Sequence, residues 1–283
     1  MSAIPNFGYR SARAEARAMR ALYAASLPRR VRRHIAPARS LPFEIYSYSG
    51  ESALPEQVAS IRSLLRHAGR PNKFNVVSDG THSTRSLRLL RAIDPCVAVA
   101  HHEDWLPRNV PEEMRTYLAA HPTGKQLALI MRLPVDSPAL YTDSDVLFFP
   151  GATALHSLDQ ERVRYLADCR LSADTRLFRE EKERTDPVNT GVLFLPRKMD
   201  WSLGIARFLE LEGAPDFFTN QTMTHLTLHA NGGEAFDPRK FVLQLDDQFV
   251  HEDRYAARDI VLRHYVNPVR HKFWNAVMRG LSR

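Results

Sequence analysis

From Leu41 onward, short stretches with the residues of β-strands alternate with longer stretches that have a helical period. Phe43–Tyr48, Lys73–Val77 and Cys96–Ala100 are strand-like, and Gln57–Arg66 repeats apolar side chains at helical spacing between the first two. This alternation predicts βαβ units and therefore an α/β fold, with a mostly parallel, twisted sheet flanked by helices. It restricts the fold more than any other feature of the sequence.

Polar segments follow several of these strands. Ser47–Gly50 and Ser78–Gly80 follow the first two, and Asp143–Asp145 follows a further apolar stretch, Ala139–Thr142. Ligands of open α/β sheets bind outside the carboxyl ends of the strands. We therefore expect these three segments to lie along one edge of the sheet and to contain binding residues.

Several common functional motifs are absent from the sequence. It contains no Gly-x-Gly-x-x-Gly, no phosphate loop ending in Gly-Lys-Ser/Thr, and no Gly-x-Ser-x-Gly. The dinucleotide-binding, P-loop ATPase and common hydrolase classes therefore lose their main sequence support.

The net charge of +7 lies in the first 40 residues. Residues 1–40 contain nine Arg and one acidic residue, Glu15, whereas the rest of the chain contains 30 basic and 31 acidic residues. A body so close to neutral argues against a broad face for a nucleic acid, and no nucleic-acid partner is expected. We interpret residues 1–40 as a basic helical arm, with helices near Ser11–Ser26 and Pro28–Ile35, and residues 41–283 as one domain.

The arm has three interpretations. It could pack on the outside of the domain, lie peripherally on an anionic membrane surface, or serve as a transit peptide. Cys96 and Cys169 have no metal-ligand spacing and favour a reducing compartment. We expect a cytoplasmic protein, peripheral at the inner membrane face if the arm binds lipid.

The segment Tyr141–Asp145 contains the strongest chemical signal. In an extended segment, Asp143 and Asp145 would face the same side. Two such close carboxylates repel each other unless a cation lies between them, and oxygen ligands suit Mg²⁺ or Mn²⁺. An acidic turn at the end of a strand is the alternative.

Further polar features follow in the second half of the chain. Asn189-Thr190-Gly191 precedes an apolar stretch, Asn220-Gln221 lies near the start of a helical stretch, and His264 lies near the end of the strand-like Ile260–Tyr265. A basic and aromatic segment, Arg270–Trp274, comes next. Each feature alone also occurs in ordinary turns, cores and solvated surfaces.

In this order, the motifs resemble those of the GT-A glycosyltransferases, and most nearly those of glycosyltransferase family 8, the glycogenin and galactosyltransferase-like group. The last family motif reads His-x-x-Gly-x-x-Lys-Pro-Trp, whereas this chain has Asn267 in place of the Gly and a displaced basic group. The resemblance covers about residues 41–275. It implies a GT-A (Rossmann-like) fold and transfer of a sugar from a nucleotide-diphospho-sugar, with a UDP-sugar expected, to a glycan, lipid-linked or small-molecule acceptor.

The resemblance also implies roles for single residues. Asp145 and His264 would ligate Mn²⁺ or Mg²⁺, with Asp143 contacting the metal or the donor ribose. The metal would bridge the two phosphates and stabilise the departing nucleoside diphosphate. A leaving group that gains negative charge needs fixed positive charge nearby, and Arg270 with Lys272 resembles the cationic group that covers the pyrophosphate.

Other donor contacts are implied on the same basis. Tyr46 and Ser47 would hold the base, Asp79 would contact the base or the ribose, and Lys125 resembles the donor-binding cation on the helix before the acidic motif. Ser144, within that motif, is the remaining donor-binding candidate.

Asn189 resembles the Asn that contacts the sugar, and Gln221 belongs to the family's catalytic pair. Family members typically have Asp-Gln at this pair, whereas this chain has Asn220-Gln221. Without a carboxylate at that position, a covalent double displacement loses its nucleophile.

Two alternative functions remain. A sugar nucleotidyltransferase would also combine a doubly wound sheet with a metal, but that class opens with a Gly-rich loop, and Tyr46–Glu51 contains only Gly50. A non-catalytic protein that kept the fold would be expected to lack Asp145 or His264, and both are present.

Overall fold

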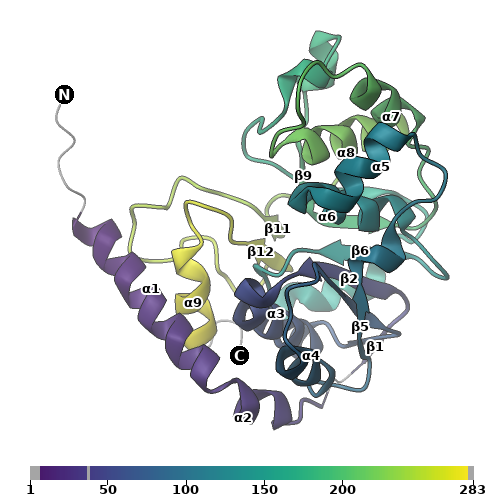
Figure 1. The fold of residues 1–283 in the computed structure, drawn as a ribbon. Coiled ribbons are helices and arrows are strands. Elements are labelled where there is room, and N and C mark those ends of the chain that lie inside the picture. The colour runs from purple at the N-terminus through teal and green to yellow at the C-terminus, as the bar shows by residue number, and fades with distance from the viewer. Residues whose placement is uncertain (1–6, 37–38, 280–283) are drawn as a thin grey trace.

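A seven-stranded sheet lies at the centre of the computed structural model, which describes residues 7–36 and 39–279 (Figure 1). The outer ends of the expected arm and domain, residues 1–6 and 280–283, and residues 37–38 lie outside the described residues. The strands of the central sheet are β2 (Glu44–Ser49), β4 (Phe74–Ser78), β5 (Val97–His101), β6 (Ala139–Thr142), β8 (Arg164–Ala167), β9 (Val188–Leu195) and β10 (Glu234–Ala235).

The strand order is β10-β8-β9-β6-β2-β4-β5. The strands from β6 to β5 are mutually parallel, as is the pair β10 and β8, whereas β9 runs antiparallel to both β6 and β8. The mostly parallel sheet expected from the sequence is therefore confirmed. Because β2, β4 and β6 are parallel, the residues that follow them meet at one edge.

Helices cover both faces of the sheet (Figure 1). The α-helices are α1 (Phe7–Ala25), α2 (Leu27–Arg32), α3 (Leu54–His67), α4 (Thr84–Arg91), α5 (Glu112–Ala120), α6 (Pro122–Arg132), α7 (Ser202–Leu209), α8 (Thr219–Ala230) and α9 (His271–Arg279). The 3₁₀ helices are η1 (Glu51–Ala53), η2 (His102–Trp105), η3 (Pro150–Ser157), η4 (Thr175–Leu177) and η5 (Glu181–Arg184).

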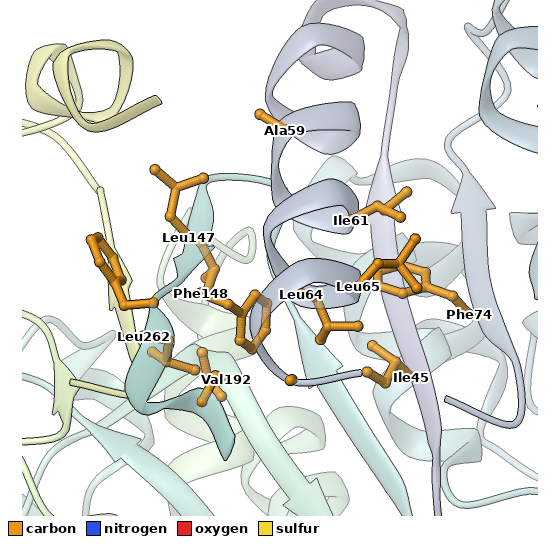
Figure 2. Packing of buried hydrophobic residues seen from close by; sticks show 14 of the residues in the cluster. Ile45, Ala59, Ile61, Leu64, Leu65, Phe74, Leu147, Phe148, Val192 and Leu262 are labelled. Carbon is orange, nitrogen blue, oxygen red and sulfur yellow. The ribbon is translucent and has the colours of Figure 1, made fainter. Parts of the chain in front are cut away.

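Alternate side chains of the strands enter two separate cores, because successive residues of a strand point to opposite faces. Ile45 lies in the core beneath α3, and the next residue, Tyr46, lies in the core beneath α5 to α8. Figure 2 shows the first core, where Ile61 and Leu65 of α3 pack near Ile45 and Phe74. All four side chains are fully buried.

A second, three-stranded sheet completes the edge where the expected site lies. It consists of β7 (Val146–Phe148), β11 (Phe241–Val242) and β12 (Leu262–His264), with β12 antiparallel to β7. The chain turns at Ser144 and Asp145 to pass from β6 into β7. The expectation of an extended segment at Asp143–Asp145 is therefore wrong. A short parallel pair, β1 (Ser40–Leu41) and β3 (Arg70–Pro71), lies apart from both sheets.

The described part of the arm packs on the domain. α1 runs beside α9 (Figure 1), and the rings of Tyr23 and Trp274 lie 5.1 Å apart. Tyr23, Leu27 and Val31 are buried in the first core. No helix in the described part of the chain is both long enough and apolar enough to cross a membrane.

Candidate active site

Asp143, Asp145 and His264 form a tight cluster at the carboxyl edge of the sheet. Their nearest ligand atoms all lie within 4.8 Å of one another. His264 Nε2 lies 3.0 Å from Asp145 Oδ1 and 3.6 Å from Asp143 Oδ2. The antiparallel pairing of His264 with Val146 brings the histidine to the acidic turn, 119 residues away along the chain. These three residues offer the donor atoms of a divalent metal site.

The hydrogen bonds of Asn189 determine which nitrogen of His264 faces the carboxylates. The Gly191 backbone N–H donates to Asn189 Oδ1 at 2.9 Å, and the Asn189 amide nitrogen donates to Asp168. Asn189 Oδ1 therefore accepts from His264 Nδ1, 3.0 Å away. In a neutral imidazole this leaves the Nε2 lone pair toward the two carboxylates, the arrangement found at metal-ligating histidines.

The pKa shifts of Asp143, Asp145 and His264 show that the cluster favours positive charge beside the two carboxylates. Burial raises the pKa of Asp143, and the neighbouring Asp145 carboxylate raises it further. Burial would also raise the pKa of Asp145, but His264 and Arg270 outweigh it and hold this pKa low. Burial would lower the pKa of His264, yet the two carboxylates outweigh it and raise this pKa. The half-buried Asp143 and the buried Asp145 thus stabilise positive charge beside them, which His264 and Arg270 supply in this structure.

Gly191 has no side chain because His264 occupies the space. A Cβ atom at this position would lie 2.1 Å from His264 Cε1 and 2.9 Å from Asn189 Oδ1. Asn189, Thr190 and Gly191 lie within β9 and not in a turn before a strand, so the Asn-Thr-Gly sequence is a packing requirement of the cluster.

Two cavities meet at Arg270. The first, of about 600 Å³, is lined by Arg13, Arg17 and Arg20 of α1; we call it the arginine-lined cavity. The second, of about 330 Å³, is lined by the side chains Asn189, Asn220, Gln221, Asp143 and Asp168, among others; we call it the amide-lined cavity. Asp145, Asn267 and Arg270 line both, and Arg270 forms an ion pair with Asp145.

The amide-lined cavity contains a carboxylate that the sequence analysis did not consider. Asp168 Oδ2 accepts from Asn189 Nδ2 and Gln221 Nε2, each at 3.3 Å. Asp168 directly follows β8, so an Asp after an apolar stretch was the available signal. Together with Asn189 and Gln221, it forms a group of donors and acceptors suited to sugar hydroxyls.

A chain of amides links α8 to the acidic cluster. Asn220 Nδ2 donates to Gln126 Oε1 at 2.9 Å, and Gln126 Nε2 donates to Asp143 Oδ1 at 3.0 Å. An Asp at position 220 could not make the first of these donations. The Asn in place of the expected Asp thus orients Gln126, which in turn orients Asp143.

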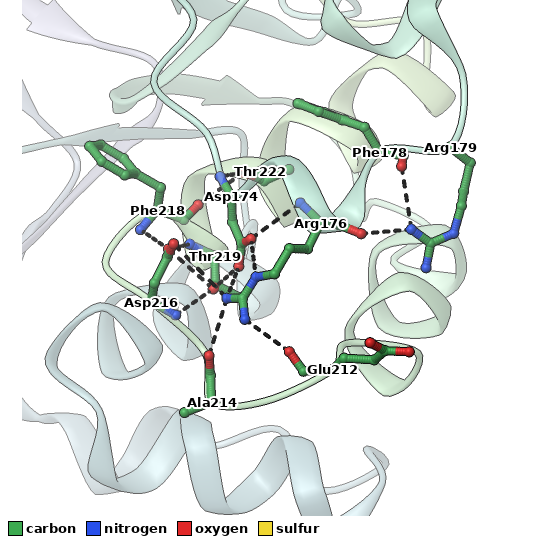
Figure 3. A network of polar contacts seen from close by, with 10 residues as sticks. All are labelled: Asp174, Arg176, Phe178, Arg179, Glu212, Ala214, Asp216, Phe218, Thr219 and Thr222. Atoms are coloured by element: carbon green, nitrogen blue, oxygen red, sulfur yellow. Dashed lines mark hydrogen bonds and ion pairs between the residues drawn. The ribbon is translucent and has the colours of Figure 1, made fainter.

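A polar network around the buried Asp174 holds the segment that leads into α8 (Figure 3). The Asp174 carboxylate accepts two hydrogen bonds from Arg176, each at 2.7 Å, and one from Thr219 Oγ1 at 2.7 Å. Arg176 also donates to the backbone oxygens of Glu212 and Ala214. Burial would raise the pKa of Asp174, but these hydrogen bonds outweigh it and lower this pKa. The network positions the start of α8, and with it Asn220 and Gln221.

Two of the expected base-binding residues lie elsewhere. β2 continues to Ser49, so Tyr46 and Ser47 lie in the middle of the strand. Tyr46 is buried with its ring 5.4 Å from that of Trp105, and Ser47 Oγ is buried and donates to Gln57 at 2.7 Å. Neither lines the cavities at Arg270.

Lys272 also points away from the cavities. It is fully buried, with Nζ 3.3 Å from Asp247 Oδ2 and 2.8 Å from the Val250 carbonyl oxygen, to which it donates. Fully buried Arg263 forms an ion pair with the same Asp247. Lys272 thus compensates charge inside the protein, and of the two expected cations only Arg270 faces the cavities.

Asp79 and Lys125 lie together at the same edge but line neither cavity. Lys125 Nζ donates to the Asp79 carbonyl oxygen at 3.5 Å. A Cβ at Gly50 would lie 2.0 Å from Asp79 Oδ2, so the glycine makes room for this carboxylate. Ser144 lines the arginine-lined cavity.

Comparisons with known proteins find solved structures with a similar fold. Neither a scan against protein-family models nor a search of curated proteins finds a match. The solved galactosyltransferase LgtC, in complex with donor and acceptor sugar analogs, superposes with a TM-score of 0.56 over 85% of this chain and 95% of its own, at 14% identity. The fold is that of the GT-A glycosyltransferases.

Other GT-A structures are similar to the same extent. Mouse xyloside xylosyltransferase 1 gives a TM-score of 0.55 at 14% identity, over 81% of this chain and 99% of its own. The bifunctional glycosyltransferase WbbM gives 0.55 at 11% identity, over 87% of this chain and 50% of its own. At these identities the GT-A likeness concerns the fold.

Proposed function

We propose that this chain is a metal-dependent glycosyltransferase of the family 8 type. It would move a sugar from a nucleotide-diphospho-sugar, with a UDP-sugar as the expected donor, to a glycan, lipid-linked or small-molecule acceptor. The observation that carries the proposal is the Asp143–Asp145–His264 cluster, which lies beside Arg270 at the carboxyl edge of a GT-A sheet.

The residues present fit a divalent cation. Two carboxylates and the Nε2 atom of an imidazole converge, and Asn189 accepts a hydrogen bond from Nδ1 on the other side of the ring. This donor set suits Mn²⁺, with Mg²⁺ as the alternative. A bound metal would supply positive charge to the two phosphates of the donor and to the departing nucleoside diphosphate.

Arg270 would supply the second positive charge. Its side chain is 53% exposed at the junction of the two cavities, and Asp145 keeps it in place. A guanidinium aimed at the leaving diphosphate stabilises the charge that develops as the sugar–phosphate bond breaks.

The amide-lined cavity would hold the transferred sugar. Asn189 and Gln221 both donate to Asp168 there, and hydroxyl groups of a sugar can donate to the carboxylate and accept from the amides. Asp168 is therefore included among the proposed substrate-binding residues.

A panel of nucleotide-sugars tests the proposal. The purified protein, incubated with Mn²⁺, is expected to hydrolyse or bind at least one UDP-sugar, and Asp145→Asn should lower that turnover by orders of magnitude. Asp136→Asn, an exposed Asp outside the cluster, is the matched control and should behave as the parent protein. Turnover by Asp145→Asn in EDTA-treated buffer that equals the parent's would refute the metal-dependent function.

A further inference from the structure

α1 carries a row of arginines beside the face that packs on the domain. Arg13, Arg17 and Arg20 are four and three residues apart, a spacing that places them on one side of a helix. All three line the arginine-lined cavity, together with Arg270 and Asp145 of the candidate active site. Part of the most basic segment of the sequence, residues 1–40, therefore borders the cavity next to Asp143, Asp145 and His264.

α1 contacts the domain both before and after these arginines in the sequence. At its start, Tyr9 Oη donates to the Pro268 carbonyl oxygen at 3.3 Å, and the Tyr9 ring lies 5.2 Å from that of His271. At its other end, Tyr23 packs on Trp274. Arg13 and Arg17 lie between these anchors, so the helix holds them over the cavity.

The charges around the cavity do not balance. Four arginines line it, against two carboxylates, Glu56 and Asp145. Arg20 pairs with Glu56, with Nη2 and Oε2 3.0 Å apart, and Arg270 pairs with Asp145. Arg13 and Arg17 form no ion pair with a carboxylate in the described part of the chain. The cavity thus has two uncompensated positive charges and room for a ligand of nucleotide size.

We propose that α1 forms a wall of the substrate-binding site, and that Arg13 and Arg17 bind phosphate oxygens of a substrate. Guanidinium groups form strong, often bidentate hydrogen bonds to phosphate. The nucleoside diphosphate of the donor is the expected source of the phosphate, because the cavity is continuous with Asp145 and Arg270. This inference rests on the proposed glycosyltransferase function and deepens it.

The test compares two double variants that remove the same charge from the same arm. Arg13→Gln with Arg17→Gln removes the cavity arginines, and Arg29→Gln with Arg32→Gln removes two exposed arginines of α2 that do not line the arginine-lined cavity. Gln keeps a helix propensity close to that of Arg, so both variants should keep the helices. Calorimetric titration with UDP and Mn²⁺ should show about ten- to hundredfold weaker binding for the first variant. The second variant should bind within about twofold of the parent.

Binding to vesicles that contain a polyprenyl diphosphate separates the two sources of phosphate. Unchanged UDP affinity with lost vesicle binding in the Arg13, Arg17 variant would assign these residues to the phosphate of a lipid-linked acceptor. Unchanged binding of both probes would overturn the proposal. An equal loss in both double variants would also overturn it, because the effect would then be that of net charge alone.

UDP binding by Asp145→Asn separates failure of the proposed role of α1 from failure of the proposed glycosyltransferase function. If Asp145→Asn loses UDP binding while the Arg13, Arg17 variant binds both probes normally, only the role of α1 is wrong. If the parent protein binds no nucleoside diphosphate at all, the proposed function itself fails.

Discussion

At the scale of single residues, the candidate site depends on the absence of a side chain at position 191. Gly191 lets the His264 ring pack directly against β9, and its N–H fixes the Asn189 oxygen that accepts from His264. The φ angle of Gly191 is not in the left-handed region, so a larger residue would be excluded by contact alone.

Gly191→Ala is therefore expected to displace His264 from Asp145. Changes to groups that orient a metal ligand typically lower metal affinity about ten- to hundredfold, and we expect a loss of that size in a Mn²⁺ titration. Leu193→Ala is the control, because Leu193 is buried in the other core and its truncation lowers stability without touching His264. Mn²⁺ affinity in Gly191→Ala equal to that of the control would show that His264 is not a ligand.

Lys272 and Asn220 show why a sequence-based analysis can assign a side chain the wrong role. The partner of Lys272, Asp247, lies 25 residues away in a loop, and no local pattern indicates that the two meet inside the protein. At position 220, the family pattern predicts a carboxylate, whereas the amide donates to Gln126, a contact across 94 residues. The residue type indicates which groups each side chain can bind. Contacts between distant parts of the chain determine which partner it has in the folded protein.

At the scale of elements, α8 and the start of β9 are joined by His225. His225 Nε2 donates to the Glu183 carbonyl oxygen at 2.6 Å, and Nδ1 accepts from the Val188 N–H at 3.3 Å. Only neutral imidazole can serve both partners. Burial lowers the pKa of His225 to about 4.

This depressed pKa makes stability depend on pH with a definite sign. The unfolded chain binds a proton at His225 from about pH 6.5 downward, whereas the folded protein resists protonation until about pH 4. The free energy of unfolding should therefore fall as pH decreases through this window, by about 1–2 kcal/mol between pH 7 and pH 5 from this residue. Urea unfolding of the parent and of His225→Asn at both pH values measures it. Equal pH dependence in the two proteins would contradict the assignment.

Several regular elements of the central sheet were predictable, because their apolar residues repeat with the period of a strand or a helix. β2, α3, β4 and β5 appear where the sequence indicated them, whereas β8 and β10 had no such prediction. The three-stranded sheet was only partly predictable, because β7 and β12 are three residues long and form only by pairing with each other. The ends of strands were also hard to predict. Because β2 continues to Ser49, Tyr46 and Ser47 lie within the strand and not at the edge of the sheet.

At the scale of the whole molecule, the candidate site lies where four distant parts of the chain meet. The acidic turn after β6, the start of α8, the segment from His264 to Arg270, and α1 all border the two cavities. Three arginines of the basic arm, Arg13, Arg17 and Arg20, line the same cavity as Glu56 and Asp145 of the domain. Packing on α9 makes α1 part of the fold, whatever else it binds.

The central claim is that Asp143, Asp145 and His264 hold a metal that binds the nucleoside diphosphate. Calorimetric titration of UDP into the parent protein, once with Mn²⁺ and once with EDTA, tests it most directly. Metal and UDP should each increase the affinity for the other, by at least about tenfold, and this coupling should vanish in Asp145→Asn and persist in Asp136→Asn. Equal UDP affinity with Mn²⁺ and with EDTA in the parent protein would contradict the account.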